Sequence, residues 1–216
     1  QWKVLHERLR RVKYLADSQI TSDLLSGASA VLVDEAHLLS QEKLEYLLRY
    51  CGNRPVIFSS DYENMLSPEE LDRAAVHALE QISGIQSFRL TNRIRTNAEI
   101  SSFIQNMMCL PERKKGRHFP HVTVLYANDD READVLLSDA QHQGYQVILN
   151  EAEPAICAGR LAMVLDQRYF YDRQNYLRSE DRSVRRLFHQ LNGAKEELLL
   201  VVKQNEPLYA VLLDLL

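Results

Sequence analysis

The chain has 216 residues, which is enough for one large domain or two small ones. Hydrophobic residues make up 45% and charged residues 26%, as in ordinary globular proteins, and the 7 Gly and 6 Pro are too few for a long flexible linker. The net charge of −4 excludes a protein that coats nucleic acid by charge alone, although it leaves room for a local basic groove.

The cysteines and the hydropathy pattern bear on the compartment. Cys51, Cys109 and Cys157 are odd in number, far apart and without a C-x-x-C pair, which argues against a disulfide framework or a zinc site and favours a reducing, cytoplasmic compartment. The longest apolar run is too short to span a bilayer, so we expect no membrane partner. The start is charged and amphipathic rather than a signal peptide, and because it lacks an initiator Met we expect the natural N-terminus to lie upstream.

Strands and helices are predicted to alternate along the first part of the chain. Residues 28–33 form a short apolar run, typical of a strand buried on both faces, and residues 55–59 form a second one. Between them a helix is predicted over 40–50, with Ser40 as its N-cap. A further helix is predicted over 67–82, because Ser, Pro and two acidic residues open it.

The same alternation continues through the rest of the chain. The predicted strands are 87–90, 121–126, 145–149, 160–165 and 197–203. The predicted helices are 97–108, 130–141, 183–191 and 207–216. The pattern predicts an α/β protein with mostly parallel sheets, and the break between two units is expected between Leu90 and Pro120.

Two adjacent carboxylates, Asp34 and Glu35, follow the first predicted strand in the run VLVDEAH. Ligands of open α/β sheets bind at such strand ends. In P-loop NTPases an Asp in this place helps to hold the Mg²⁺ that bridges the β- and γ-phosphates, and an adjacent carboxylate can orient or deprotonate the attacking water. The run therefore predicts a nucleotide-hydrolysing site. The plainer alternative is that Asp34 caps the next helix and Glu35 is solvated.

Together with the D-E-A-H run, three segments in the right order resemble superfamily 1 helicases of the UvrD/Rep kind. They look closest to the bacterial helicase-like ATP-binding proteins related to the Schlafen helicase domain. Residues 56–64 (VIFSSDYEN) resemble motif III, in which a strand ends in Asp and a Gln three residues later senses the γ-phosphate; Asn64 stands at the Gln position. Residues 90–100 (LTNRIRTNAEI) resemble motif IV, and Arg95 falls on the Arg that reaches the γ-phosphate from the second domain.

The third segment, residues 187–198, resembles motif VI, a helix running into a strand with the pattern T-R-A-x-x-x-L. The family's arginine finger corresponds to Gly193, and we do not expect the nearby Lys195 to replace it. The family's motif V, a Gly-Gln-Glu-Phe-Asp-like run, should precede residues 161–166, yet CAGR stands there at 157–160.

The resemblance covers nearly the whole chain and implies two P-loop NTPase (RecA-like) units that are incomplete at the N-terminus. Residues 1–90 would be the C-terminal part of the first domain and residues 91–216 the second. The resemblance also implies ATP and Mg²⁺ as cofactors and single-stranded DNA or RNA as the partner. The implied roles are metal binding by Asp34, water activation by Glu35, and contact with the γ-phosphate by Asn64 and Arg95.

The phosphate-binding loop G-x-x-x-x-G-K-[ST] does not occur in the sequence. We therefore expect this chain by itself to be inactive, and the family places the loop before residue 1. The losses at this loop, at motif V and at Gly193 also fit an alternative from another class, a degenerate pseudo-ATPase that serves as an interaction or regulatory module.

Two further features have more than one interpretation. The aromatic residues within 169–176 alternate with arginines, which is typical either of stacking on single-stranded bases or of packing at a domain edge. His37 either couples the acidic pair to motif III or is a plain polar residue of the loop.

Overall fold

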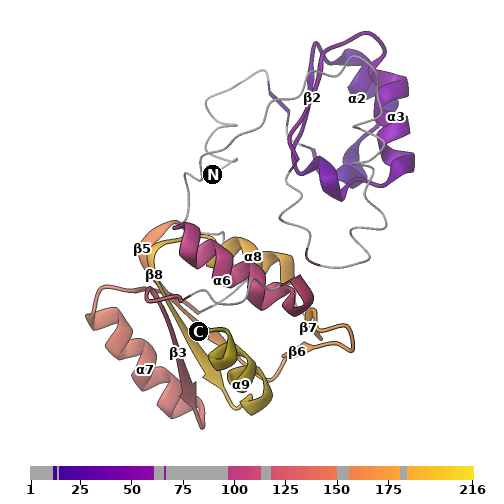
Figure 1. The fold of residues 1–216 in the computed structure, drawn as a ribbon. Coiled ribbons are helices and arrows are strands. Elements are labelled where there is room, and N and C mark those ends of the chain that lie inside the picture. Colours follow the sequence, from indigo (N-terminus) through magenta and orange to yellow (C-terminus); the bar gives the residue numbers. More distant parts are fainter. Residues whose placement is uncertain are drawn as a thin grey trace. The chain divides into compact units, whose positions relative to one another are not determined.

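The structure is a computed structural model that describes residues 12–13, 15–60, 66, 97–112, 118–149, 156–180 and 184–216. The chain divides into two compact units. Unit 1 comprises Gln1–Met65 and Glu69–Gln86, and unit 2 comprises Leu66–Pro68 and Ser87–Leu216. Figure 1 shows unit 1 in indigo to violet and unit 2 from magenta to yellow. The predicted boundary at 90/91, the helix over 67–82 and the strand over 87–90 lie outside the described residues.

In the described part of unit 1, two short parallel strands pack on two helices. The strands are β1 (Val31–Val33) and β2 (Val56–Phe58), and the helices are α2 (Ser22–Gly27) and α3 (Gln41–Cys51). The 3₁₀ helix η1 (Asp17–Gln19) precedes α2, and the 3₁₀ helix η2 (Ala36–Leu38) lies between β1 and α3. Ser40 caps α3 as predicted, since its hydroxyl accepts a hydrogen bond from the Lys43 amide at 3.3 Å. The sequence did not predict α2, a single short turn-like helix with few apolar positions.

The outer face of the β1–β2 pair contradicts the prediction. Both strands were expected to be buried on both faces, but Leu32 and Ile57, which are paired in register, are 75% and 58% exposed. Their neighbours on each strand point the other way and pack in the clusters formed with α2 and α3. A run of consecutive apolar residues shows that a segment suits a strand, but it does not show whether a second layer covers the strand.

The described part of unit 2 contains a parallel sheet in the strand order β3-β8-β5-β4. Its strands are β3 (Val122–Ala127), β4 (Gln146–Ile148), β5 (Ala158–Leu165) and β8 (Ala194–Lys203). Its helices are α6 (Ala98–Met108), α7 (Asp130–His142), α8 (Val184–Leu191) and α9 (Glu206–Leu215), with a 3₁₀ turn η4 (Leu110–Glu112). The predicted α/β class with parallel strands is therefore confirmed.

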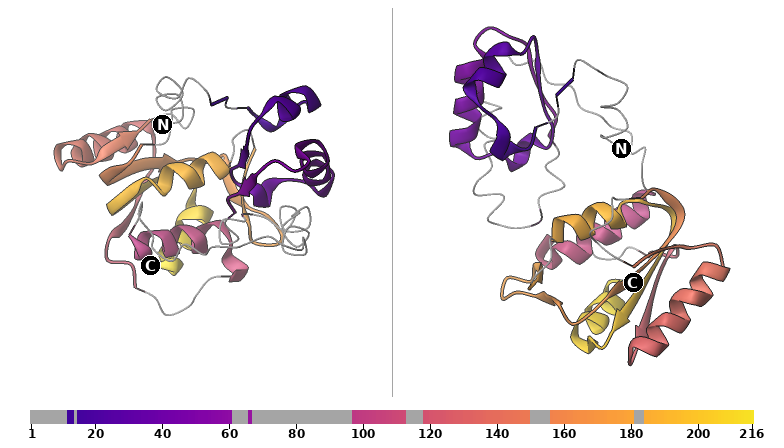
Figure 2. Two further views of the ribbon diagram at one scale, coloured as in Figure 1. Left: turned by 90° about the horizontal axis from the view of Figure 1, so that it is seen from above. Right: turned by 180° about the vertical axis from the view of Figure 1, so that it is seen from behind.

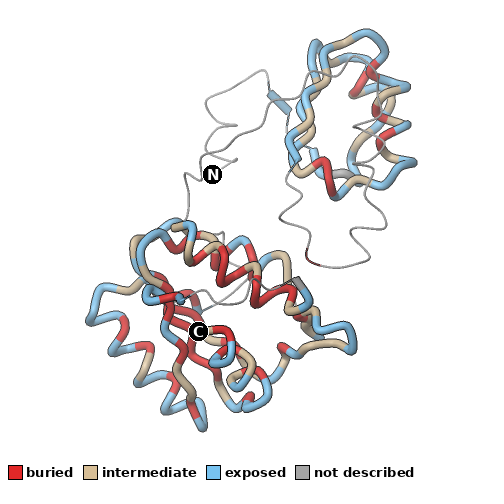
Figure 3. The backbone as a smooth tube through the Cα atoms, viewed as in Figure 1, coloured by how far each residue is buried: buried red, intermediate tan, exposed pale blue. Residues whose placement is uncertain are grey.

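Helices cover both faces of this sheet (Figures 1 and 2). Of the described helices, α7 packs on one face, where Leu137 meets Leu199 and Val201 of β8. The helices α6, α8 and α9 lie on the opposite face over the larger core, which includes Phe103 and Leu200. Strand β8, one of the two inner strands, is buried from Leu198 to Val202 because helices cover it on both sides. Figure 3 colours buried residues red, and they are concentrated where the sheet and helices of unit 2 pack together.

A hairpin of β6 (Tyr169–Tyr171) and β7 (Leu177–Ser179) extends unit 2 and was not predicted as strands. Tyr169 is 1% exposed and belongs to the main core. The Tyr171 hydroxyl donates to a backbone oxygen of α6 at 2.8 Å. For these two tyrosines the structure supports packing rather than base stacking, while Phe170 stays 43% exposed.

Among the described residues, no helix has both the length and the apolar character needed to span a bilayer.

Candidate active site

The acidic pair lies where the two strands of unit 1 end. Asp34 directly follows β1 and Ser59 directly follows β2, and since the strands are parallel and adjacent, both residues lie at one edge. The Ser59 hydroxyl donates to Asp34 Oδ1 at 2.6 Å, and the Glu35 amide donates to the same oxygen at 3.1 Å. Within the described residues nothing donates to the other oxygen, Oδ2, so the carboxylate is oriented through one oxygen and open at the other.

Backbone hydrogen bonds hold this edge together. The Ser59 amide donates to the Val33 oxygen at 2.8 Å, and the Ala36 amide donates to the Ser59 oxygen at 2.8 Å. These bonds extend the β1–β2 pairing past the last strand residues and into η2. The position of the Asp34 side chain is therefore set by two strands rather than by a free loop.

The capping alternative does not describe this arrangement. The N-cap residue of η2 is Glu35, and in the described part of the chain its side chain makes no capping bond. Asp34 uses its oxygen on Ser59 and on the next amide instead.

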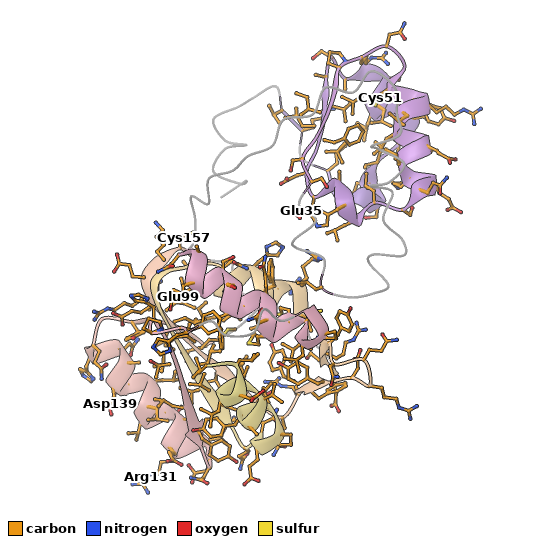
Figure 4. All side chains as sticks on the ribbon, viewed as in Figure 1. Glu35, Cys51, Glu99, Arg131, Asp139 and Cys157 are labelled. Atoms are coloured by element: carbon orange, nitrogen blue, oxygen red, sulfur yellow. The ribbon has the colours of Figure 1, made fainter. Side chains whose placement is uncertain are left out.

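Glu35 has an unusual backbone conformation. Its φ of 54° and ψ of 42° place it in the left-handed region, which costs a residue with a side chain about 1–2 kcal/mol. Backbone strain of this kind persists only where the surrounding structure enforces it, and it is concentrated at functional sites. Figure 4 labels Glu35 at one end of unit 1, with Cys51 at the other.

The Glu35 side chain is partly buried in the protein and partly exposed to solvent. It is 37% exposed, yet its Oε2 atom is buried and lies 3.2 Å from Nε2 of His37, which is 0% exposed. One carboxylate oxygen thus faces a buried imidazole, and the exposed part of the side chain is available to solvent.

The residues present can be compared with what Mg²⁺ requires. In phosphate sites this ion takes one or two carboxylates and completes its shell with phosphate oxygens and water. Asp34, with Oδ2 open, fits that pattern. No group of three or more His, Cys, Asp or Glu that could hold a metal occurs in the part of the chain that the structure describes. Asp34 is thus suited to contribute one carboxylate to a metal whose shell is completed by phosphate oxygens and water.

The other predicted site residues, Asn64 and Arg95, lie outside the described residues, so their roles stay predictions. Sequence reasoning missed Ser59 as a partner of the acid. A usable signal existed, because Ser59 follows the second strand directly and neighbouring parallel strands end at the same edge.

The position that the resemblance aligns with an arginine finger, Gly193, is sterically closed. A Cβ added at Gly193 would lie 1.9 Å from the backbone oxygen of Ile156 and 2.9 Å from that of Gln190. Both obstacles are backbone atoms, so an Arg at this position would require the chain to move. Lys195, two residues further, is exposed on β8.

The carboxyl edge of the unit 2 sheet is polar as well, but its charged groups are paired. Lys203 Nζ lies 2.5 Å from Asp130 Oδ1, and Asp166 forms an ion pair with Arg168. Asn205 is 7% exposed and donates to two backbone oxygens at 2.9 and 2.7 Å. These contacts give each of these polar groups a structural role. We therefore place the candidate site at the edge of unit 1.

A comparison of the chain with protein-family models finds no match, and a comparison with curated proteins finds no significant one either.

Proposed function

We propose that the intact protein is an ATP-dependent motor on single-stranded DNA or RNA, similar to superfamily 1 helicases and built on two RecA-like P-loop NTPase units in the cytoplasm. The observation that carries the proposal is the pair Asp34 and Glu35 at the joint end of two parallel strands, with the Asp34 carboxylate oriented by Ser59. The strained backbone at Glu35 adds support, since a plain loop would have relaxed it.

Each residue has a distinct part in the proposed reaction. Asp34 would hold Mg²⁺ through Oδ2, and the bound ion neutralises charge on the β- and γ-phosphates. Glu35 would orient the attacking water and take its proton. The resemblance assigns Asn64 and Arg95 to the γ-phosphate. Binding and hydrolysis of ATP would drive a conformational cycle that moves the protein along a strand of nucleic acid.

The test is ATP hydrolysis by the full-length protein with and without single-stranded DNA or RNA. We expect stimulation by one of them, and we expect Glu35→Gln to lower kcat by about 100-fold or more while ATP binding is kept. Glu42→Gln, an exposed change in the first turn of α3, is the matched control and should leave kcat unchanged. Absence of stimulation by both nucleic acids would rule out the motor.

The geometry at Gly193 favours a second candidate, a pseudo-ATPase that serves as an interaction or regulatory module. The backbone of Ile156 leaves no room for a finger arginine there, and such an arginine contributes about 10³–10⁵ in rate in related reactions. Calorimetric titration of the full-length protein with a non-hydrolysable ATP analogue separates the candidates. Binding without turnover supports the pseudo-ATPase, whereas neither binding nor turnover supports a purely structural module.

A further inference from the structure

We infer that His37 is a positioning residue that holds the Glu35 carboxylate in place for water activation. The inference rests on the proposed function, because it gives His37 a part in the same site. It goes beyond that function, because neither the motif pattern nor the strand-end geometry assigns the imidazole to this carboxylate.

The contact joins two buried atoms. His37 Nε2 lies 3.2 Å from Glu35 Oε2, which is within the range of an ion pair although the two atoms are not aligned as a hydrogen bond, and both atoms are shielded from solvent. A buried imidazole and a buried carboxylate oxygen each carry a desolvation cost unless a polar group meets them. Each atom reduces that cost for the other.

The local backbone explains how two residues so close in sequence can meet. Side chains at i and i+2 do not face one another on a regular helix. Here Glu35 is left-handed and η2 begins directly after it, so the chain reverses locally and the side chain of His37 folds back toward Glu35. The bond from the Ala36 amide to the Ser59 oxygen, 2.8 Å long, ties the turn to β2. The strain at Glu35 thus has a structural result, which is the contact itself.

One oxygen of the Glu35 carboxylate is buried while the side chain is partly exposed, and this arrangement suits a general base. Oε2 is held against the imidazole, while the side chain as a whole keeps 37% exposure. The anchored oxygen fixes the orientation of the group, and its partner oxygen is left to accept a proton from water. Catalytic groups must be held to within about 0.5 Å of their productive geometry, and a misplacement of about 1 Å can cost about 100-fold in rate.

If His37 has only a structural role, a different experimental result is expected. If the imidazole only filled space beneath η2, its replacement would lower the melting temperature but leave the kcat of the folded protein unchanged. Replacement of a positioning residue lowers kcat and leaves the KM for ATP nearly constant, and a polar side chain that can reach the carboxylate restores the activity.

The experiment compares His37→Leu and His37→Gln in the full-length protein. We expect His37→Leu to lower kcat between about 10- and 100-fold, with KM for ATP changed less than about twofold. His37→Gln should recover most of that loss, because its amide N–H can still reach Oε2. The matched control is His142→Gln at the exposed end of α7, where the imidazole contacts only a backbone oxygen among the described residues. This control should behave as wild type.

A second measurement does not depend on ATP and covers the case in which a buried substitution impairs folding. Melting temperatures are measured for Glu35→Ala, His37→Leu and the double variant, since each single change removes the contact. If the side chains interact, the melting temperature of the double variant should fall by less than the sum of the decreases in the two single variants. Additive losses would overturn the contact and the inference with it.

The two measurements separate the inference from the proposed function. An active wild type with unchanged kcat in folded His37→Leu overturns the positioning role and leaves the motor intact. If the wild type hydrolyses no ATP, the proposed function fails and the positioning role fails with it, whereas non-additive melting would still show that the contact exists.

Discussion

The hydroxyl of Ser59 donates a 2.6 Å hydrogen bond to Oδ1 of Asp34, joining the first residues after two neighbouring parallel strands. The bond leaves Oδ2 as the oxygen open to a metal. In metal sites, partners of this kind orient the ligand, and their loss typically costs about 10- to 100-fold in metal affinity or activity.

We therefore expect Ser59→Ala to raise the Mg²⁺ concentration needed for half-maximal ATP hydrolysis by about tenfold, whereas Ser59→Thr keeps the hydroxyl and behaves as wild type. Titration of ATPase activity with Mg²⁺ measures the effect in the full-length protein. Ser60→Ala is the neighbouring control, since Ser60 is exposed and does not bond to Asp34. An equal shift in both alanine variants would contradict the orienting role of Ser59.

The left-handed backbone of Glu35 leads to a stability prediction that does not depend on ATP. Glycine adopts a φ of 54° freely, whereas alanine retains the strain. Glu35→Gly and Glu35→Ala both lose the His37 contact, so the comparison isolates the backbone. We expect the glycine variant to be the more stable of the two by about 1 kcal/mol in urea unfolding. Equal stabilities would show that Glu35 is not held in the left-handed region.

The close approach of Gly193 to Ile156 leads to a prediction for unit 2. An alanine Cβ would meet backbone at 1.9 Å, and backbone cannot swing away as a side chain can. We expect Gly193→Ala to lower the free energy of unfolding by about 3 kcal/mol. The control is Gly27→Ala, because a Cβ there meets nothing within 4 Å and Gly27 is the last residue of α2. The control should be neutral or slightly stabilising.

A phenol, a carboxylate and a guanidinium meet on one face of the unit 2 sheet. The Tyr145 hydroxyl donates to Glu197 Oε2 at 2.5 Å, and Arg160 lies 3.0 Å from Glu197 Oε1. Burial, followed by the hydrogen bond and the negative charge of Glu197, raises the pKa of Tyr145 from its ordinary value of 10.0 to about 12, against a smaller opposing effect of Arg160. The raised pKa means that the folded state favours the neutral phenol.

This contribution to stability is complete below pH 10 and is lost as the pH rises from there through about 12. Titration of tyrosinate absorbance should show a midpoint at about 12 that disappears in Tyr145→Phe. Burial also raises the pKa of Tyr171, so that tyrosine titrates late in both proteins. In Glu197→Gln the midpoint should fall, because a neutral amide replaces the carboxylate while burial remains. An unchanged midpoint in Glu197→Gln would mean that Glu197 does not contribute to the shift.

Local features of the sequence were sufficient to predict most of the described elements. Ser40 and the apolar spacing after it predict α3, and the apolar run before Asp34 predicts β1. The long apolar stretch at residues 197–203 predicts a strand, and it lies within β8, which helices cover on both faces. These predictions succeed because a cap, a periodicity or a strand-forming run acts within a few residues of its own position.

The same local reasoning failed where distant parts of the chain decide the outcome. The runs around Leu32 and Ile57 look like that of β8, yet these two side chains are exposed, since covering a strand depends on what packs above it. The hairpin of β6 and β7 was missed because its aromatic residues also suit a loop that binds single strands. The roles of Asn64 and Arg95 rest on the family resemblance and stay predictions.

The sequence by itself determined that Asp34 and Glu35 stand at the end of a strand, since that follows from residue order. Only the tertiary structure decided what surrounds them. It brings Ser59 to Asp34 across 25 positions, places His37 against one oxygen of Glu35, and closes the position of Gly193 with the backbone of Ile156. Such contacts depend on strand register and on the path of the chain in space, and a linear pattern of residue types carries neither.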